Sequence, residues 1–415
     1  MQPYDMKELE ERVILVGVQE SFSEDVEESL DELAELCETA GALVVGRVIQ
    51  NREKIHPGTY VGKGKIEEIA LLMEELGATG IVCDDELSPA QLNNLEKELD
   101  CKVMDRTLII LDIFAARANT SEGNIQVELA QLRYRAARLV GLRNSLSRLG
   151  GGIGTRGPGE KKLEMDRRLI HARISQLKAE LAQVQKHREL IRSKRKKDQM
   201  VVAAIVGYTN AGKSTLLNTL TDAGVLEEDK LFATLDPTTR LLELPGGQNI
   251  LLTDTVGFIR KLPHHLIEAF KSTLEEAKYA DIIIHVVDAS NPQKEKQMHV
   301  VYETLKDLGV KDQPILTLFN KQDRIDNPEI LKDMKADKTL KISAKTGQGL
   351  DDLKDELEKI LRARSILLER VFPYEKAGLI QIVRAKGQLL EEEYRGDGIY
   401  VKAFVPAEIY GKVAY

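Results

Sequence analysis

The chain is poor in aromatic residues and in cysteine. Its 415 residues include no tryptophan, an aromatic content of 5% and only three cysteines. Because Cys37, Cys83 and Cys101 form no Cys-x-x-Cys pair, we expect neither a disulfide framework nor a structural zinc site. No apolar run approaches the roughly 18 residues of a membrane-spanning helix, and the polar start lacks the layout of a signal peptide. We therefore expect a soluble, cytoplasmic protein without a transmembrane segment.

Composition and charge indicate a multidomain protein with one unusual segment. Hydrophobic residues make up 42% and charged residues 30%, which supports large cores, and the length predicts two to four domains. The net charge is −8, yet residues 129–198 hold 19 Lys and Arg against 6 Asp and Glu, a local net charge of +13. Such a segment indicates a polyanionic partner, although a solvated helical face would have the same composition.

The first 116 residues have the pattern of an α/β domain. Apolar runs predict strands at residues 12–18, 42–49 and 80–83. Helical periodicity predicts helices at residues 27–40, 65–76 and 89–98, and a further apolar stretch covers residues 107–116. Because strands and helices alternate, we expect an N-terminal α/β domain, residues 1–116, with some parallel strands.

A basic helical hairpin is predicted over residues 117–198. Two long helices, at residues 124–149 and 162–197, flank a loop with the sequence LGGGIGTRGPGE. Six glycines among ten residues are incompatible with a helix, so we expect a loop from Leu149 to Glu160 at the tip. Its clustered cations favour close approach to a phosphate chain over the alternative of a simple flexible linker.

The remainder divides into a second α/β region and a small tail. Residues 199–364 contain strand candidates at 201–206, 241–244, 250–252, 282–287, 315–319 and 340–342, mostly separated by helical patterns, as in a doubly wound sheet. Residues 365–415 contain a predicted helix at 377–385 and strands at 389–394 and 399–404, joined at Gly396-Asp397-Gly398. We therefore expect a small C-terminal α+β domain after the larger one.

A phosphate-binding loop begins the second α/β region. The segment Gly207-Tyr208-Thr209-Asn210-Ala211-Gly212-Lys213-Ser214, followed by Thr215, matches G-x-x-x-x-G-K-S between a strand and a helix. Backbone N–H groups of such a loop point at phosphates, and the helix N-terminus adds positive potential. We expect Lys213 to contact the β- and γ-phosphates and Ser214 to bind Mg²⁺.

Two further motifs predict which base is bound. Asn320-Lys321-Gln322-Asp323 follows an apolar strand, and a carboxylate there can accept hydrogen bonds from guanine N1–H and its amino group. Adenine offers neither donor, so an unpaired carboxylate would disfavour ATP. Ser343-Ala344-Lys345 follows the last strand and is placed to contact the base edge, although this signal is weak by itself. Together they predict GTP and GDP as ligands.

The fourth motif is Asp254-Thr255-Val256-Gly257, at the start of the segment that we call switch II. We expect Asp254 to hold Mg²⁺ through water and the Gly257 amide to sense the γ-phosphate. With this motif, the chain resembles the GTPase domains related to translation factors.

Phe258 stands where many GTPases have a glutamine that orients the attacking water. Phenylalanine cannot do this, so intrinsic hydrolysis should be slow unless another residue of the chain supplies the function. Asn210 resembles the asparagine of GTPases that recruit K⁺, so K⁺ is a possible second cofactor.

The whole chain also resembles the HflX family of ribosome-associated GTPases. The resemblance is carried by residues 105–123, 126–135, 149–160, 232–240 and 254–276. It places the Mg²⁺ threonine of switch I at Thr234, whereas hydroxyl chemistry alone suggested Thr238 or Thr239. The family pattern thus adds Phe232, Ala233, Thr234, Leu235 and Asp236 to the nucleotide site, with Lys213, Thr234 and Gly257 in catalytic roles.

The resemblance also implies a function. Members of this family bind the large ribosomal subunit and split stalled or idle ribosomes under stress, with the hairpin loop near the peptidyl-transferase region. Ribosomal RNA would then be the polyanion that the basic segment meets. Two alternatives remain: a GTP-dependent switch for a protein partner, and an ATP-dependent RNA remodeller that the GTPase domain regulates. No long uncharged heptad seam is present, so we expect a monomer off the ribosome.

Overall fold

The computed structural model describes residues 11–20, 25–147, 158–197, 200–221, 231–232, 235–263, 266, 271–325 and 331–413. The chain forms two compact units. The N-terminal unit comprises residues 1–187 together with 228–236 and 260–272, and the C-terminal unit comprises residues 188–227, 237–259 and 273–415. Two short segments of the predicted GTPase region therefore pack with the N-terminal residues. The division into four domains stays a prediction. No helix in the described ranges is long and apolar enough to cross a membrane.

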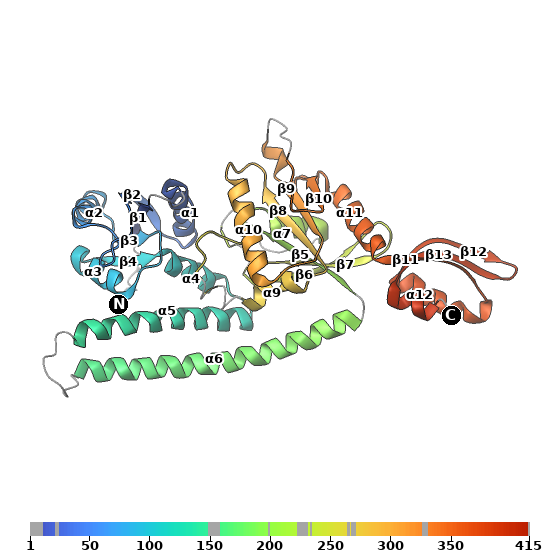
Figure 1. The fold of residues 1–415 in the computed structure, drawn as a ribbon, viewed down its shortest axis with the longest axis horizontal. Helices are drawn as coiled ribbons and strands as arrows, with labels where there is room; N and C mark the ends of the chain where they lie inside the picture. Colours follow the sequence, from blue (N-terminus) through green and yellow to red (C-terminus); the bar gives the residue numbers. More distant parts are fainter. Residues whose placement is uncertain are drawn as a thin grey trace, which may run out of the picture. The chain divides into compact units, whose positions relative to one another are not determined.

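A four-stranded parallel sheet organises the N-terminal unit (Figure 1). Its strands are β1 (Arg12–Glu20), β2 (Leu43–Arg52), β3 (Gly80–Cys83) and β4 (Lys102–Asp105), in the order β2-β1-β3-β4. The connecting helices are α1 (Val26–Thr39), α2 (Lys63–Leu76) and α3 (Pro89–Leu99), and α4 (Arg106–Arg117) follows β4. Ile14, Ile81 and Cys83 are fully buried in the core. The predicted alternation is confirmed, and the apolar stretch at residues 107–116 is a helix.

Two long helices form the predicted hairpin. Figure 1 shows α5 (Ser121–Ser147) and the first part of α6 (Pro158–Lys197) side by side in opposite directions. Leu129, Ile174 and Leu177 are buried between them, because apolar residues recur at three- and four-residue steps. The loop prediction was wrong for its last three residues, which are helical from Pro158 onward, since proline is favoured at the first helical position. Residues 148–157 of the glycine-rich loop lie outside the described residues.

Asp105 attaches α5 to the N-terminal sheet. This buried carboxylate, at the end of β4, accepts hydrogen bonds from Tyr134 Oη at 2.8 Å and from Arg138 Nη2 at 2.6 Å. It also caps α4 by accepting from the Leu108 amide at 2.9 Å. Both carboxylate oxygens thereby accept hydrogen bonds, which offsets the cost of burying the charge.

The C-terminal unit contains a six-stranded sheet in the order β10-β9-β8-β5-β7-β6. Its strands are β5 (Val201–Gly207), β6 (Thr238–Glu243), β7 (Asn249–Asp254), β8 (Ile282–Asp288), β9 (Ile315–Asn320) and β10 (Lys338–Lys341). Only β6 pairs antiparallel among these strands, at the edge. The helices that accompany the sheet are α7 (Lys213–Thr221), α9 (Lys271–Tyr279), α10 (Lys294–Leu308) and α11 (Leu350–Ala363). This arrangement confirms the expected doubly wound sheet.

A three-stranded antiparallel sheet, in the order β11-β13-β12, ends the chain. Its elements are β11 (Ser365–Phe372), α12 (Ala377–Lys386), β12 (Gln388–Arg395), β13 (Gly398–Pro406) and α13 (Ala407–Val413). The predicted β-hairpin of β12 and β13 is confirmed, because Arg395 pairs with Gly398 across the turn. The sequence analysis missed β11: it starts immediately after α11 without a turn signal, and Glu369 and Arg370 interrupt its apolar pattern.

The hairpin core yields a first prediction. Leu177→Ala should lower the free energy of unfolding by about 2–4 kcal/mol, because the side chain is fully buried and its removal leaves a cavity. Leu169→Ala on the same helix is the matched control, since Leu169 is 63% exposed and should change stability by less than about 0.5 kcal/mol. Urea unfolding followed by circular dichroism measures both. Equal effects of the two substitutions would show that α5 and α6 do not pack as described.

Candidate nucleotide-binding site

The phosphate-binding loop joins the end of β5 to the start of α7, and its glycines are required by geometry. Gly212 has φ +91°, and a Cβ there would lie 2.3 Å from Asn320 Nδ2. A Cβ at Gly207 would lie 2.3 Å from the carbonyl oxygen of Val286. Asn210 adopts φ +58°, a left-handed conformation that asparagine tolerates better than most residues. The sequence motif therefore forms the strand–loop–helix turn that phosphate binding requires.

Lys213 lies at the first turn of α7 and is only 6% exposed. Its Nζ donates a hydrogen bond of 2.7 Å to the carbonyl oxygen of Tyr208, which holds the side chain along the loop. Burial lowers the pKa of this lysine to about 8, against the opposing effect of Asp254 and with a smaller contribution from Lys321. A phosphate chain near the ammonium would restore its charge.

Ser214 and Asp254 come together below the loop. Ser214 Oγ donates a 2.8 Å hydrogen bond to Asp254 Oδ2, and Asp254 is fully buried at the end of β7. The neighbouring Thr255 hydroxyl donates to the carbonyl oxygen of Ile205 at 2.7 Å, which fixes the chain at this point. A hydroxyl and a carboxylate are hard oxygen ligands, so this pair fits Mg²⁺ chemically.

Switch II is hydrogen-bonded to the phosphate-binding loop. The Thr209 amide donates to Phe258 O at 2.8 Å, and the Phe258 amide donates to Gly207 O at 3.1 Å. A Cβ on Gly257 would lie 2.9 Å from Thr209 Cα and 3.0 Å from Lys213 Nζ, so only glycine fits at this close approach. The Phe258 side chain is 2% exposed and therefore packs in the core. It has no group that could orient water.

The predicted guanine-recognition residues lie on two loops that Asn320 connects. Asn320 is buried, its Nδ2 donates to Ala211 O at 2.9 Å, and its Oδ1 accepts from the Ala344 amide at 2.8 Å. Asp323 is exposed and accepts a 2.5 Å hydrogen bond from Ser343 Oγ. That hydrogen bond, opposed by partial desolvation, lowers the pKa of Asp323 and favours the ionised form, which can accept from guanine.

The rest of this predicted group is placed as follows. Lys321 pairs with Asp288 at 2.8 Å, and the Gln322 amide donates to Ile342 O at 3.2 Å. Lys345 is exposed, whereas Ser343 and Ala344 are buried. The structure therefore brings Asn320 and Ala344 to the phosphate-binding loop and keeps the Asp323 carboxylate accessible.

The described part of switch I packs within the N-terminal unit. Phe232 has φ +53°, is 2% exposed and meets Phe114 of α4 edge-on, with ring centroids 4.7 Å apart. Leu235 is also buried. Ala233 and Thr234 lie outside the described residues, so the role of Thr234 stays a prediction. The two other candidates lie in β6, where the Thr239 hydroxyl is 3.0 Å from that of Thr253.

Asp236 holds the two residues that lead into the first helix of the hairpin, a contact that the sequence analysis missed. Its Oδ2 accepts from the amides of Asn119 at 3.0 Å and Thr120 at 2.9 Å, and its Oδ1 accepts from Thr120 Oγ1 at 2.5 Å. A Cβ on Gly123 would lie 2.5 Å from Asp236 Oδ1, so this glycine makes room for the carboxylate. The run Asn-Thr-Ser-Glu at residues 119–122 is a helix-start signal that could have placed the start of α5 earlier, but not its partner.

These features together define a P-loop GTPase: the strand–loop–helix turn, the carboxylate after β7, and the Asn-Lys-x-Asp segment after β9. Family models agree along the chain. "GTP-binding GTPase N-terminal" matches residues 27–115, "GTP-binding GTPase Middle Region" matches residues 117–195, and "50S ribosome-binding GTPase" matches residues 202–321.

Individual relatives identify the family. The chain is 70% identical to GTPase HflX of Lacrimispora saccharolytica over 99% of this chain and 97% of that protein. It is 43% identical to GTPase HflX of Escherichia coli over 84% of this chain and 83% of that protein. The chain belongs to the HflX family of GTPases. Among solved structures, a GTP-binding protein from Sulfolobus solfataricus in complex with GDP is 26% identical, covering 84% of this chain and 98% of that chain, with a TM-score of 0.45.

The lowered pKa of Lys213 yields a prediction for nucleotide binding. Only the protonated side chain attracts phosphate, so the Kd for GDP should be constant below the pKa of about 8 and rise above it. At about pH 9 the Kd should be roughly tenfold higher, because binding must then take up a proton. Titration with a fluorescent GDP analogue from about pH 6.5 to about pH 9 measures this. Lys213→Arg is the control, since a guanidinium stays charged; a constant Kd for the native protein would contradict the prediction.

The contact of Asp236 with the residues before α5 yields another prediction. Asp236→Ala should speed amide exchange at Asn119 and Thr120 by about 5- to 30-fold, because losing hydrogen bonds to a charged group costs about 1–2 kcal/mol. Asp236→Asn is the matched variant: it keeps an acceptor oxygen and should retain most of the protection. Hydrogen–deuterium exchange resolved to the peptide covering residues 117–124 measures the effect. Unchanged exchange in the alanine variant would mean that the carboxylate does not bind these two amides in solution.

Proposed function

We propose that this GTPase binds the large ribosomal subunit and dissociates stalled or idle ribosomes, and that the ribosome stimulates GTP hydrolysis, which drives release. The observation that carries this proposal is the local net charge of +13 over residues 129–198 in a chain of net charge −8. Ribosomal RNA is a dense polyanion, and phosphate contacts by Lys and Arg dominate affinity for such partners. The match of residues 202–321 to a family model described as a ribosome-binding GTPase supports the same partner.

The surface of α6 supports a large contact. Arg167, Lys178 and Lys186 are exposed on this helix, so their charges face solvent. Two large apolar side chains are exposed beside them, Met165 at 65% and Leu169 at 63%. Exposed apolar side chains among cations are typical of surfaces that bind a partner rather than of simple solvated helices. Together with the glycine-rich loop at the hairpin tip, this helix is the proposed ribosomal RNA contact.

The site residues have proposed roles in GTP hydrolysis. Lys213 neutralises the β- and γ-phosphates, the Gly257 amide donates to the γ-phosphate, and Asp323 accepts from guanine. Ser214 and Thr234 would ligate Mg²⁺, with Asp254 holding it through water. When bound, Mg²⁺ neutralises charge that develops between the β- and γ-phosphates. Asn210 is the proposed contact for K⁺, which would add a further positive charge at the phosphates.

Phe258 explains why an activator is needed. Its side chain is buried and cannot position water, so the attacking water must be oriented by another group. A GTPase that works only on its target avoids futile hydrolysis, and the ribosome is the proposed source of the missing group. Release follows because switches I and II lose their γ-phosphate contacts after hydrolysis.

The test is the GTP hydrolysis rate with and without isolated large ribosomal subunits, in KCl and in NaCl. Stimulation by about 10³-fold or more is expected, comparable with activators that complete other GTPase sites. Lys213→Ala is the control that should lose hydrolysis under all conditions. A rate unaffected by subunits, with normal GTP binding, would refute the ribosomal proposal; equal stimulated rates in the two salts would refute only the proposed K⁺ contact.

A further inference from the structure

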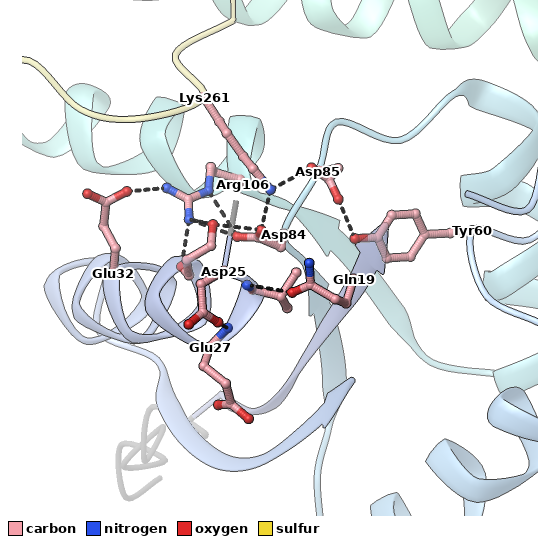
Figure 2. Close-up of polar contacts among 11 residues, drawn as sticks. Gln19, Asp25, Glu27, Glu32, Tyr60, Asp84, Asp85, Arg106 and Lys261 are labelled. Atoms are coloured by element: carbon pink, nitrogen blue, oxygen red, sulfur yellow. Dashed lines mark hydrogen bonds and ion pairs between the residues drawn. The ribbon is translucent and has the colours of Figure 1, made fainter. Parts of the chain in front are cut away.

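Four residues near the carboxyl ends of the N-terminal strands form what we call the acidic cluster: Glu32, Asp84, Asp85 and Arg106. Asp84 and Asp85 directly follow β3, which lies beside β1 in the sheet. The chain leaves β1 toward β2 on one side and later returns to β3 on the other. In open α/β sheets, such a switch in strand order is where ligands bind. The side chains that meet here are drawn in Figure 2.

Arg106 anchors the acidic cluster. It is 1% exposed, and its guanidinium donates to Asp84 Oδ1, to Glu32 Oε2 and to Ser29 O at 2.7, 2.7 and 2.8 Å. Burial raises the pKa of Asp84, but Arg106 and then Lys261 outweigh that effect, so the pKa is lowered and the carboxylate stays charged. Because Arg106 uses Oδ1, the Oδ2 atom of Asp84 can face a second cation.

Lys261 is that second cation, and it comes from switch II. Its Nζ donates to Asp84 Oδ2 at 2.5 Å and to Asp85 Oδ1 at 2.7 Å, as Figure 2 shows. The other oxygen of Asp85 accepts from Tyr60 Oη at 2.7 Å, which fixes the carboxylate. The preceding residue, Arg260, is 4% exposed and lies 3.5 Å from Glu28.

The backbone at Lys261 indicates that the charge contacts hold this conformation. Lys261 has φ +51°, a left-handed conformation that costs a non-glycine residue about 1 kcal/mol or more. Such a residue stays there only when its surroundings determine it. Its side chain is 35% exposed, while Asp84 is 1% exposed, so the lysine reaches a carboxylate that is itself buried.

Chain continuity connects this contact to the nucleotide site. Gly257, whose close approach to Lys213 was described above, is four residues before Lys261, and Phe258 pairs with the phosphate-binding loop. The stretch from Gly257 to Lys261 is therefore held at both ends. We propose that the acidic cluster is a docking site for Lys261 of switch II and makes Lys261 a positioning residue for the Gly257 amide.

Docking of Lys261 should affect the binding affinity for GTP but not that for GDP. This step rests on the proposed function, in which the Gly257 amide donates to the γ-phosphate. A docked Lys261 pre-orders the amide, whereas an undocked segment must be ordered when GTP binds, at an entropic cost. GDP has no γ-phosphate and does not use the amide. Docking of Lys261 thereby contributes to the preference for GTP.

Three substitutions of Lys261 separate the effect of its charge from the effect of its backbone conformation. Lys261→Ala removes the charge and disfavours φ +51°, Lys261→Gly removes the charge but permits that φ, and Lys261→Arg keeps a cation. The Kd values for GDP and for guanylyl imidodiphosphate, a GTP analogue, are measured by fluorescence titration. We expect both uncharged variants to bind the GTP analogue about three- to tenfold more weakly, with GDP affinity unchanged and the arginine variant near native.

Further variants test the carboxylates that Lys261 contacts. Asp85→Asn should weaken binding of the GTP analogue in the same direction but by less than Lys261→Ala, because Lys261 keeps its contact with Asp84. Asp85 does not contact Arg106, so its replacement leaves the buried pair of Arg106 and Asp84 intact. Combined with Lys261→Ala it should add little, since the contact with Asp85 is already lost in that variant. Arg47→Ala, which breaks an exposed ion pair with Asp31 in the same unit, is the control and should change neither affinity.

The outcomes are distinct. Equal losses for GDP and the GTP analogue, unchanged affinities, or tighter binding of the GTP analogue would each overturn the positioning role. A glycine variant that behaves like the native protein would show that the backbone, not the charge, matters, and would also overturn it. If Gly257→Ala leaves binding of the GTP analogue unchanged, the proposed role of Gly257 fails instead, whatever the Lys261 variants show.

Discussion

The packing of the N-terminal unit depends on the ion pairs and hydrogen bonds of one buried arginine, Arg106. A guanidinium that is 1% exposed is tolerated only when carboxylates and carbonyl oxygens surround it, and Asp84, Glu32 and Ser29 provide them. These partners come from α1 and from the end of β3, so the ion pair joins two layers of the fold. It also concentrates negative charge, which makes the same place suitable for Lys261. Structural stabilisation and switch docking therefore share one carboxylate.

Both switch segments have residues within the N-terminal unit, where short, specific interactions hold them. Asp236 of switch I binds the amides just before α5, the helix that leads toward the glycine-rich loop, and Lys261 of switch II enters the acidic cluster. In each case a charged side chain meets groups of complementary polarity, namely backbone amides and carboxylates. Under the proposed function, in which the Gly257 amide donates to the γ-phosphate, such contacts would carry the state of the nucleotide to the rest of the chain.

Recognition and chemistry are separated in the GTPase region. Asn320 ties the predicted base loop to the phosphate-binding loop through Ala211 and Ala344, so the residues predicted to contact the base and the phosphates lie at one edge of the sheet. Phe258 contributes to this rigidity through its backbone and its buried ring, but it offers no chemical group to the reaction. This arrangement supports the proposal that a partner activates hydrolysis, which suits an enzyme whose proposed task is timed release.

Local sequence signals were sufficient for the GTPase motifs and most elements. The glycine pattern from Gly207 to Gly212, the helix formers of α6 and the turn at Gly396 act over a few residues, and each forms as predicted. The sequence could not show β11, whose pairing with β13 is settled by distant contacts, nor that Asp236 binds the amides before α5 across more than a hundred residues. The sequence could not show that Lys261 pairs with Asp84 either, because local sequence does not indicate which distant residue a charged side chain will contact. Local chemistry determines what a segment can become, whereas the three-dimensional packing of the chain decides which buried charge it must satisfy.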